Sequence, residues 1–314
     1  MQNKIKVGIS SCLLGEKVRF DTGHKRNAYV TDVLQNYFDF VPFCPEVSIG
    51  LSIPREPIRL VLEDEKVRCV GTKNSELEFT DQLAEIAEKQ KPIHEQLCGY
   101  ILKKDSPSCG MERVKLYKNG MPTKVGVGIF AQRLMENFPS LPVEEEGRLG
   151  DMRLRENFIQ RVFVYARWKA LFHEPLTITA LQTFHAQHKY ILMSHDQEQT
   201  RALGKLLASH DHQAVEVLAE RYVSQLMNTL KTIATPKTHA NTLHHIQGYL
   251  KRDLVADDKA ELTEVIDNYR NGLLPLVVPI TLLKHHFRKH PNEHITNSYY
   301  MDPHPGELML LNHI

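Results

Sequence analysis

Hydrophobic residues follow two different periods in the two halves of the chain. Up to about residue 135, short β-branched runs alternate with amphipathic helical patterns. These patterns predict strands at 5–11, 40–43, 58–62, 67–70 and 100–104, and helices at 27–37, 81–97 and 129–136. The alternation indicates an α/β domain, Rossmann-like and built on a mostly parallel sheet.

Beyond residue 150 the apolar spacing becomes 3.6 throughout. Apolar stripes of this period begin at Leu154, Leu181, Leu218 and Leu262, and they predict an all-helical domain. The segment 139–149 has two prolines, three consecutive acids and a glycine, which is linker composition. We therefore expect an α/β domain at 1–140, a linker at 141–152 and an all-helical domain at 153–314.

Composition is that of a globular protein with room for two cores. The chain has 314 residues, of which 42% are hydrophobic and 25% charged. The longest apolar run, 273–283, is interrupted by Pro275 and Pro279, so no membrane span is expected. The N-terminus enters a strand-like run at once and lacks the pattern of a secretory signal, which favours a cytoplasmic location.

Charge gives little support for binding to nucleic acid. The formal net charge is +1, with 21 basic and 21 acidic residues in 1–150, and 18 and 17 in 151–314. Neither half has the basic excess that drives binding to a phosphate backbone.

Cysteines are confined to the first part of the chain. Cys12, Cys44 and Cys109 each follow a predicted strand beside Gly, Pro or Ser, whereas Cys69 and Cys98 lie in apolar patterns typical of packing. Three loop thiols from different strand ends suit an iron-sulfur cluster with one iron lacking a protein ligand. The alternative is that Cys12 and Cys44 are buried apolar residues and Cys109 sits in a simple turn.

Three motifs carry a resemblance to a known family. Ser-Ser-Cys-Leu-Leu-Gly at 10–15, Cys-Pro-Glu at 44–46 and Ser-Pro-Ser-Cys-Gly at 106–110 are similar to the signature of the thiouracil desulfidase family, over about residues 4–140. The resemblance implies a 4Fe-4S cluster held by Cys12, Cys44 and Cys109. Its open iron would take sulfur from a thiolated pyrimidine.

The same resemblance implies which residues handle protons. It assigns Glu46 and Ser106, with Ser108 as a further candidate, because exchange of C=S for C=O needs water to be activated. Glu46 could instead be a solvated loop acid or a partner of Arg55.

Substrate contacts are expected from residues near the first two cysteines, namely Arg19, Asp21 and Arg55. Asp21 could instead only close the Asp-Thr-Gly turn. The segment 47–55 lacks two adjacent glycines that the family resemblance would lead us to expect there. Substrate contacts along this loop can therefore differ from those of the thiouracil enzymes.

The C-terminal half resembles the YbgA-type domain, at 155–158, 184–190 and 303–308, which implies no particular activity. Fifteen of the 17 histidines lie in this half. The pairs His185 and His188, and His286 and His290, have helical spacings that can bind a divalent metal, or they are surface and core residues.

Two functions follow from these observations. The first is an iron-sulfur desulfurase acting on a thiolated nucleobase or nucleotide. The second is a metal- or cluster-bearing module associated with nucleic acid, whose cysteines serve structure or redox sensing. The basic and aromatic residues available to that module lie in the helical half: Arg155, Arg161, Arg167, Lys169 and Lys189, with Trp168 and Tyr190 for stacking.

Overall fold

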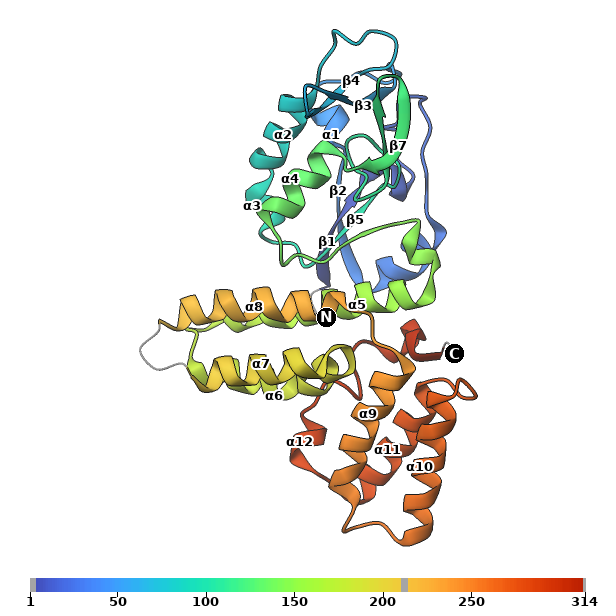
Figure 1. The fold of residues 1–314 in the computed structure, drawn as a ribbon, viewed down its shortest axis with the longest axis vertical. Coiled ribbons are helices and arrows are strands. Elements are labelled where there is room, and N and C mark those ends of the chain that lie inside the picture. The colour runs from blue at the N-terminus through green and yellow to red at the C-terminus, as the bar shows by residue number, and fades with distance from the viewer. Residues whose placement is uncertain (1–3, 210–213, 313–314) are drawn as a thin grey trace. The chain divides into compact units, whose positions relative to one another are not determined.

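The chain divides into two compact units in the computed structural model, which describes residues 4–209 and 214–312. One unit extends to Asp151 and the other begins at Met152. Figure 1 shows strands in the first unit and helices throughout the second.

Sheet A of the first unit is fully parallel. Its order is β2-β1-β5-β8, from β1 (Ile5–Ser10), β2 (Phe38–Phe43), β5 (Tyr100–Leu102) and β8 (Val143–Glu145). Each neighbouring pair is parallel. At the centre, β1 approaches β5 so closely that a Cβ on Gly8 would lie 2.4 Å from the Tyr100 ring.

Sheet B is mixed, with the order β4-β3-β6-β7. Its strands are β3 (Ile58–Glu63), β4 (Lys66–Gly71), β6 (Val114–Lys118) and β7 (Met121–Gly126). The pair β3 and β6 is parallel, and the two hairpins β3–β4 and β6–β7 are antiparallel. The sequence pattern did not predict β6 and β7. Asn119 and Gly120 turn the second hairpin with φ of 50° and 78°, as a tight hairpin turn requires.

The helices of the first unit are α1 (Pro45–Ser48), α2 (Thr80–Lys89), α3 (Lys91–His94) and α4 (Ile129–Asn137). Helices α2 and α4 contact each other beside the sheets. The single helix predicted at 81–97 is broken in two, because Pro92 can be accommodated only in the first turn of a helix. The helix predicted at 27–37 is reduced to a π-helical segment at Tyr29–Val33 and a 3-10 turn at Leu34–Asn36.

Strand β8 lies inside the segment predicted as a linker. Leu141, Val143 and Leu149 are buried, and β8 pairs with β5 over its whole length. The acidic residues there have structural partners: the Glu145 carboxylate accepts the Met111 N–H at 2.8 Å. The expected linker is therefore part of the first unit, and its Pro- and Glu-rich composition reflects an edge strand and its ends.

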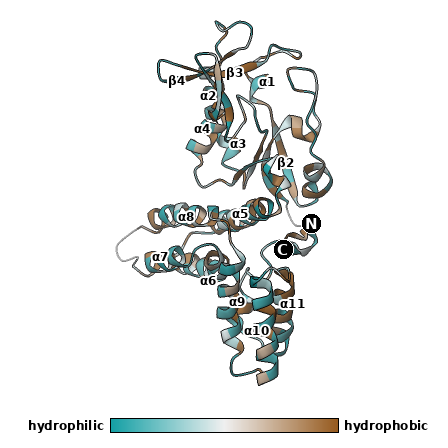
Figure 2. Ribbon diagram, turned by 45° about the vertical axis from the view of Figure 1, so that its right-hand side comes forward, coloured by the Kyte–Doolittle hydropathy of each residue, from teal (hydrophilic) through white to brown (hydrophobic). Residues whose placement is uncertain are grey.

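The second unit is helical, which confirms the predicted fold class of an α/β half followed by an all-helical half. Its helices are α5 (Met152–Ala170), α6 (Ile178–His195), α7 (Gln197–Ala208), α8 (Val215–Lys231), α9 (Pro236–Gln247), α10 (Ala256–Arg270), α11 (Val277–Lys289) and α12 (Glu293–Thr296). Figure 2 shows apolar and polar stretches alternating along these helices, as expected for helices that pack through one face. No helix among the described residues is long and apolar enough to cross a membrane.

Polar caps and an aromatic core define this helical unit. The side chains of Thr177, Asp196 and Thr235 accept backbone N–H groups at the starts of α6, α7 and α9. Trp168 stacks on Tyr222 with ring centroids 5.7 Å apart, inside one continuous apolar cluster. The apolar periods in the sequence therefore correspond to the buried faces.

We expect residues 1–151 to fold alone, whereas residues 1–140 should be much less stable. The shorter fragment lacks three buried aliphatic side chains, Leu141, Val143 and Leu149, each worth about 1.5–3 kcal/mol of burial. Thermal unfolding followed by circular dichroism should show a melting temperature lower by at least ~10 °C for the shorter fragment. Equal melting temperatures would show that β8 is not part of the folded unit.

Candidate functional site

A cavity of about 630 Å³ opens at the carboxyl ends of the strands of sheet A. Ligand sites of parallel α/β sheets are found at this edge. The polar and thiol side chains that line it include Ser10, Cys12, Arg19, Cys44, Glu46, Arg55, Lys103, Ser106, Ser108, Cys109 and Glu146. Most of the predicted site residues therefore meet in one place.

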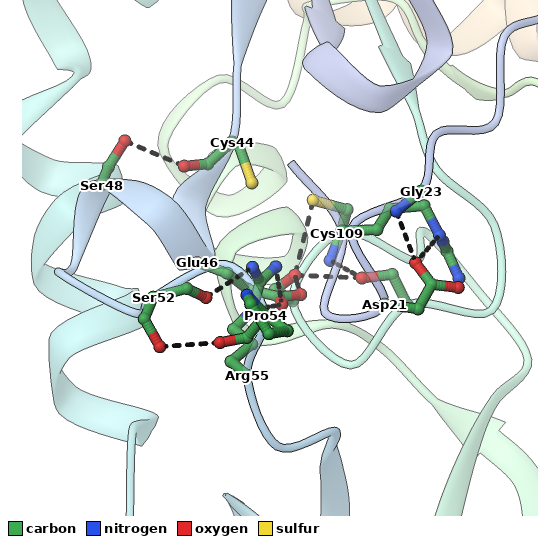
Figure 3. A network of polar contacts seen from close by, with 12 residues as sticks. Asp21, Gly23, Cys44, Glu46, Ser48, Ser52, Pro54, Arg55 and Cys109 are labelled. Atoms are coloured by element: carbon green, nitrogen blue, oxygen red, sulfur yellow. Dashed lines mark hydrogen bonds and ion pairs between the residues drawn. The ribbon is translucent and has the colours of Figure 1, made fainter. Parts of the chain in front are cut away.

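Three cysteine thiols face this cavity from three different loops. Cys12 lies in the 3-10 turn directly after β1, Cys44 directly follows β2, and Cys109 lies in the loop between β5 and β6. All are free thiols, and Figure 3 shows the Sγ atoms of Cys44 and Cys109 directed toward a common space. Cys69, fully buried in β4, and Cys98 do not line the cavity.

The environment of the thiols suits thiolates that are bound to a metal. Burial raises the pKa of Cys12 to about 11 and also raises the pKa of Cys44 and Cys109. The groups that oppose these rises are the Lys103 ammonium at Cys12, backbone N–H groups at Cys44 and the Ser108 hydroxyl at Cys109. The thiols are therefore protonated at neutral pH until a cation replaces the protons.

A chain of hydrogen bonds joins the loop of Cys109 to Glu46. The Ser108 hydroxyl donates to Oε1 of Glu46 at 2.7 Å, and the Ser106 and Ser108 hydroxyl oxygens are 3.0 Å apart. The Cys109 N–H donates to Oγ of Ser106 at 3.1 Å. Since Ser106 accepts this bond, its own proton can go to Ser108, so the chain is directed from Ser106 through Ser108 to Glu46.

Arg55 occupies the other oxygen of the Glu46 carboxylate. Its Nε and Nη2 donate to Oε2 of Glu46 at 3.0 and 2.7 Å, and the side chain of Arg55 is only 6% exposed. Arg55 lines the cavity in this ion pair, and its role in substrate binding stays a prediction. The pairing of Glu46 with Arg55, an open alternative at the sequence level, is observed, and Glu46 still lines the cavity.

Asp21 does not line the cavity, in contrast to Arg19. Its Oδ1 accepts the Gly23 N–H at 3.0 Å and lies 3.5 Å from Nε of Arg19, as Figure 3 shows for the turn. The hydrogen bond from Gly23 is the main cause of the lowered pKa of Asp21. Asp21 therefore closes the turn, and of these two residues only Arg19 lines the cavity.

Sequence reasoning missed a second ion pair on the cavity. Nζ of Lys103 lies 2.5 Å from Oε1 of Glu146, with side-chain exposures of 12% and 10%. Lys103 directly follows β5 and Glu146 directly follows β8. A polar residue just after a parallel strand is the signal that could have indicated Lys103, but β8 was not predicted, so Glu146 carried no such signal.

Gly126 and Gly128 allow close packing before α4. The N–H groups of Ile129 and Ala131, in the first turn of α4, donate to the carbonyls of Pro107 and Ser108 at 3.1 Å. A Cβ on Gly128 would lie 2.6 Å from the Ser108 carbonyl. Helix α4 is thus held directly against the loop that carries Cys109.

The residues proposed for nucleic-acid stacking in the helical half are buried. Trp168 and Tyr190 are each 4% exposed, and Arg161 is 7% exposed. The Arg167 guanidinium lies 3.8 Å above the Tyr299 ring. These positions are used by the core, so they offer no aromatic face to a nucleic acid.

The pair His185 and His188 has internal partners as well. His188 is fully buried, with Nδ1 2.7 Å from the Phe184 carbonyl, and His185 Nδ1 lies 3.0 Å from the Tyr222 hydroxyl. Across residues 4–209 and 214–312, no three His, Cys, Asp or Glu side chains are placed to share a single metal ion, the cavity thiols included. A four-iron cluster does not need that arrangement, because each thiolate binds a different iron.

Comparisons with known proteins assign different relatives to the two halves. Residues 7–146 match the family model described as 2-thiouracil desulfurase, and residues 189–305 match a protein of unknown function, DUF1722. The chain is 28% identical over 159 residues to the uncharacterized protein YbgA of Escherichia coli (strain K12), which covers 50% of this chain and 94% of that protein.

A solved structure, the 4Fe-4S-dependent thiouracil desulfidase TudS, is 27% identical to this chain, with a TM-score of 0.38, over 47% of this chain and 95% of that one. The two family matches confirm the fusion that the motifs indicated. The chain joins a region that matches the 2-thiouracil desulfurase model to a region that matches the DUF1722 model.

Proposed function

We propose that this protein is an iron-sulfur-dependent desulfidase that converts the C=S group of a thiolated pyrimidine base or nucleotide into C=O. The observation that carries the proposal is the meeting of three free thiols and the Ser106–Ser108–Glu46 chain on one cavity. This cavity lies within the residues that match the 2-thiouracil desulfurase family.

The residues present fit a 4Fe-4S cluster, with Cys12, Cys44 and Cys109 as its ligands. The three thiols come from separate loops and have hydrogen-bond donors or a cation beside them, which suits anionic sulfur. When bound, such a cluster supplies one iron without a protein ligand, a Lewis acid with affinity for sulfur.

The overall reaction is a hydrolysis, in which thiocarbonyl and water give carbonyl and hydrogen sulfide without net electron transfer. The C–O bond forms from water as the C–S bond breaks, and both protons of the water must be transferred. Ser106, at the cavity end of the hydrogen-bonded chain, can accept a water proton while its own proton passes through Ser108 to Glu46. Glu46 is thus the terminal base of the relay.

Arg55 serves as a positioning residue for Glu46. Because it occupies Oε2 with two N–H groups, Oε1 is left for Ser108, and the carboxylate is fixed relative to the cavity. A bidentate guanidinium fits this task better than an ammonium would.

Replacement of each cavity cysteine should abolish the cluster. Cys12→Ala, Cys44→Ala and Cys109→Ala should each retain far less than four iron atoms per chain after anaerobic reconstitution, because a ligand is lost. Cys69→Ala and Cys98→Ala are matched controls, since these residues do not line the cavity. Iron and sulfide analysis is the measurement. Loss of iron from Cys69→Ala equal to that from Cys44→Ala would refute the ligand set.

Replacement of relay residues should slow turnover but leave the cluster in place. Glu46→Gln, Ser106→Ala and Ser108→Ala should lose about 10²–10⁴-fold in single-turnover sulfide release from 4-thiouracil, as expected when general acid-base catalysis is removed. The comparison requires equal iron content. A near-normal rate for Glu46→Gln would reduce its carboxylate to a structural role.

Loss of Arg55 should lower the stability of the fold and also slow turnover. Arg55→Met leaves the half-buried Glu46 carboxylate without its partner and should destabilise the fold by about 3 kcal/mol. The double variant Arg55→Met/Glu46→Gln should recover most of this stability and none of the activity. Urea unfolding of both variants and the wild type is the measurement. If Arg55→Met changes only the Michaelis constant, Arg55 is a substrate ligand after all.

A further inference from the structure

The Lys103–Glu146 pair is held rigidly at the cavity wall. Besides the ion pair, Nζ of Lys103 donates to the Lys104 carbonyl at 2.9 Å, and Oε2 of Glu146 accepts the Lys104 N–H at 2.8 Å. The Lys103 N–H donates to Oγ of Ser10 at 3.0 Å, which ties the pair to the end of β1. Neither side chain has the freedom of a surface residue.

Both groups retain hydrogen-bonding capacity that these contacts do not use. An ammonium has three N–H donors, and among the described residues Lys103 directs two of them to Glu146 and Lys104. Each carboxylate oxygen of Glu146 can accept a further bond. Both residues line the cavity. A ligand there would therefore meet an N–H donor of Lys103 beside a carboxylate acceptor of Glu146.

This pattern is complementary to one edge of a thiopyrimidine. In 2-thiouracil and in 4-thiouracil, the ring carries an N–H next to the remaining C=O. An ammonium can donate a hydrogen bond to the carbonyl oxygen, and a carboxylate can accept one from the N–H. Arg55 already directs three of its five N–H donors to Glu46 and to the Ser52 carbonyl.

We propose that Lys103 and Glu146 bind the adjacent N–H and C=O of the substrate ring, an inference that rests on the proposed desulfidase function. Lys103 donates to the ring carbonyl oxygen and Glu146 accepts from the ring N–H. The pair thus selects cyclic thioamides that also carry this edge, and it orients their sulfur within the cavity.

Binding of two unreactive probes tests the inference. Uracil carries the N–H/C=O edge and 4-pyridone lacks it, and their dissociation constants can be measured by calorimetry on the reconstituted full-length protein. The wild type should bind uracil about 10–100-fold more tightly than 4-pyridone, the range for hydrogen bonds to charged groups. Lys103→Met should lose this preference, and Lys103→Arg should keep part of it.

Controls separate this role from a structural one. Lys115→Met removes an exposed lysine of sheet B and should keep the wild-type preference. The variants are compared at equal iron content, and Glu146→Gln should show an intermediate preference, because its amide oxygen still accepts. A preference for uracil that persists in Lys103→Met, or is absent from the wild type, overturns the inference. If the wild type releases no sulfide from 4-thiouracil, the proposed function itself fails.

Discussion

Parallel pairing in sheet A is the constraint on which the site depends. Since β2, β1, β5 and β8 run in the same direction, the residues that follow each strand emerge at one edge. Cys12, Cys44, Lys103 and Glu146 all occupy such positions, and the loop after β5 adds Cys109. No two of the three cysteines are close in sequence, so their meeting is a property of the sheet. The short strand β8 matters for this reason, because it supplies the edge that holds Glu146.

Charge at this edge is arranged in two pairs around buried thiols. Glu46 with Arg55 and Glu146 with Lys103 each bring a carboxylate and a cation to the same cavity. Burial of an unpaired carboxylate would be costly. Each cation therefore offsets the cost of burying the carboxylate beside it. The two pairs differ in their remaining hydrogen-bonding groups. Oε1 of Glu46 accepts the Ser108 hydroxyl, whereas Lys103 and Glu146 present a donor and an acceptor to the cavity. The first pair suits proton transfer and the second suits recognition.

Sequence motifs were sufficient for the fusion of the two regions, the fold class and most of the residues that line the cavity. They did not indicate Lys103 and Glu146, and they included Asp21, which does not line the cavity. Cys12, Cys44 and Cys109 stood out because each followed a strand-like run, and Glu46, Ser106 and Ser108 followed from the motifs around them. The pairing of Glu46 with Arg55 was only one of the alternatives, because it depends on a loop that folds back onto α1 and has no local signature. Strand β8 was hidden by the prolines before it and by its acids, of which Glu145 has a partner remote in sequence, the Met111 N–H. The Asn119-Gly120 turn is the local signal that could have indicated β6 and β7.

The central claim is a hydrolytic exchange of sulfur for oxygen at this cavity, and isotope labelling tests it directly. Reconstituted wild-type protein would be incubated with 4-thiouracil in water enriched in oxygen-18, under anaerobic conditions and without added reductant. Our account predicts uracil that carries one oxygen-18 atom at the former thiocarbonyl carbon, together with one equivalent of sulfide. Uracil without the label, sulfide that forms only when an electron donor is added, or intact thiouracil would each contradict it.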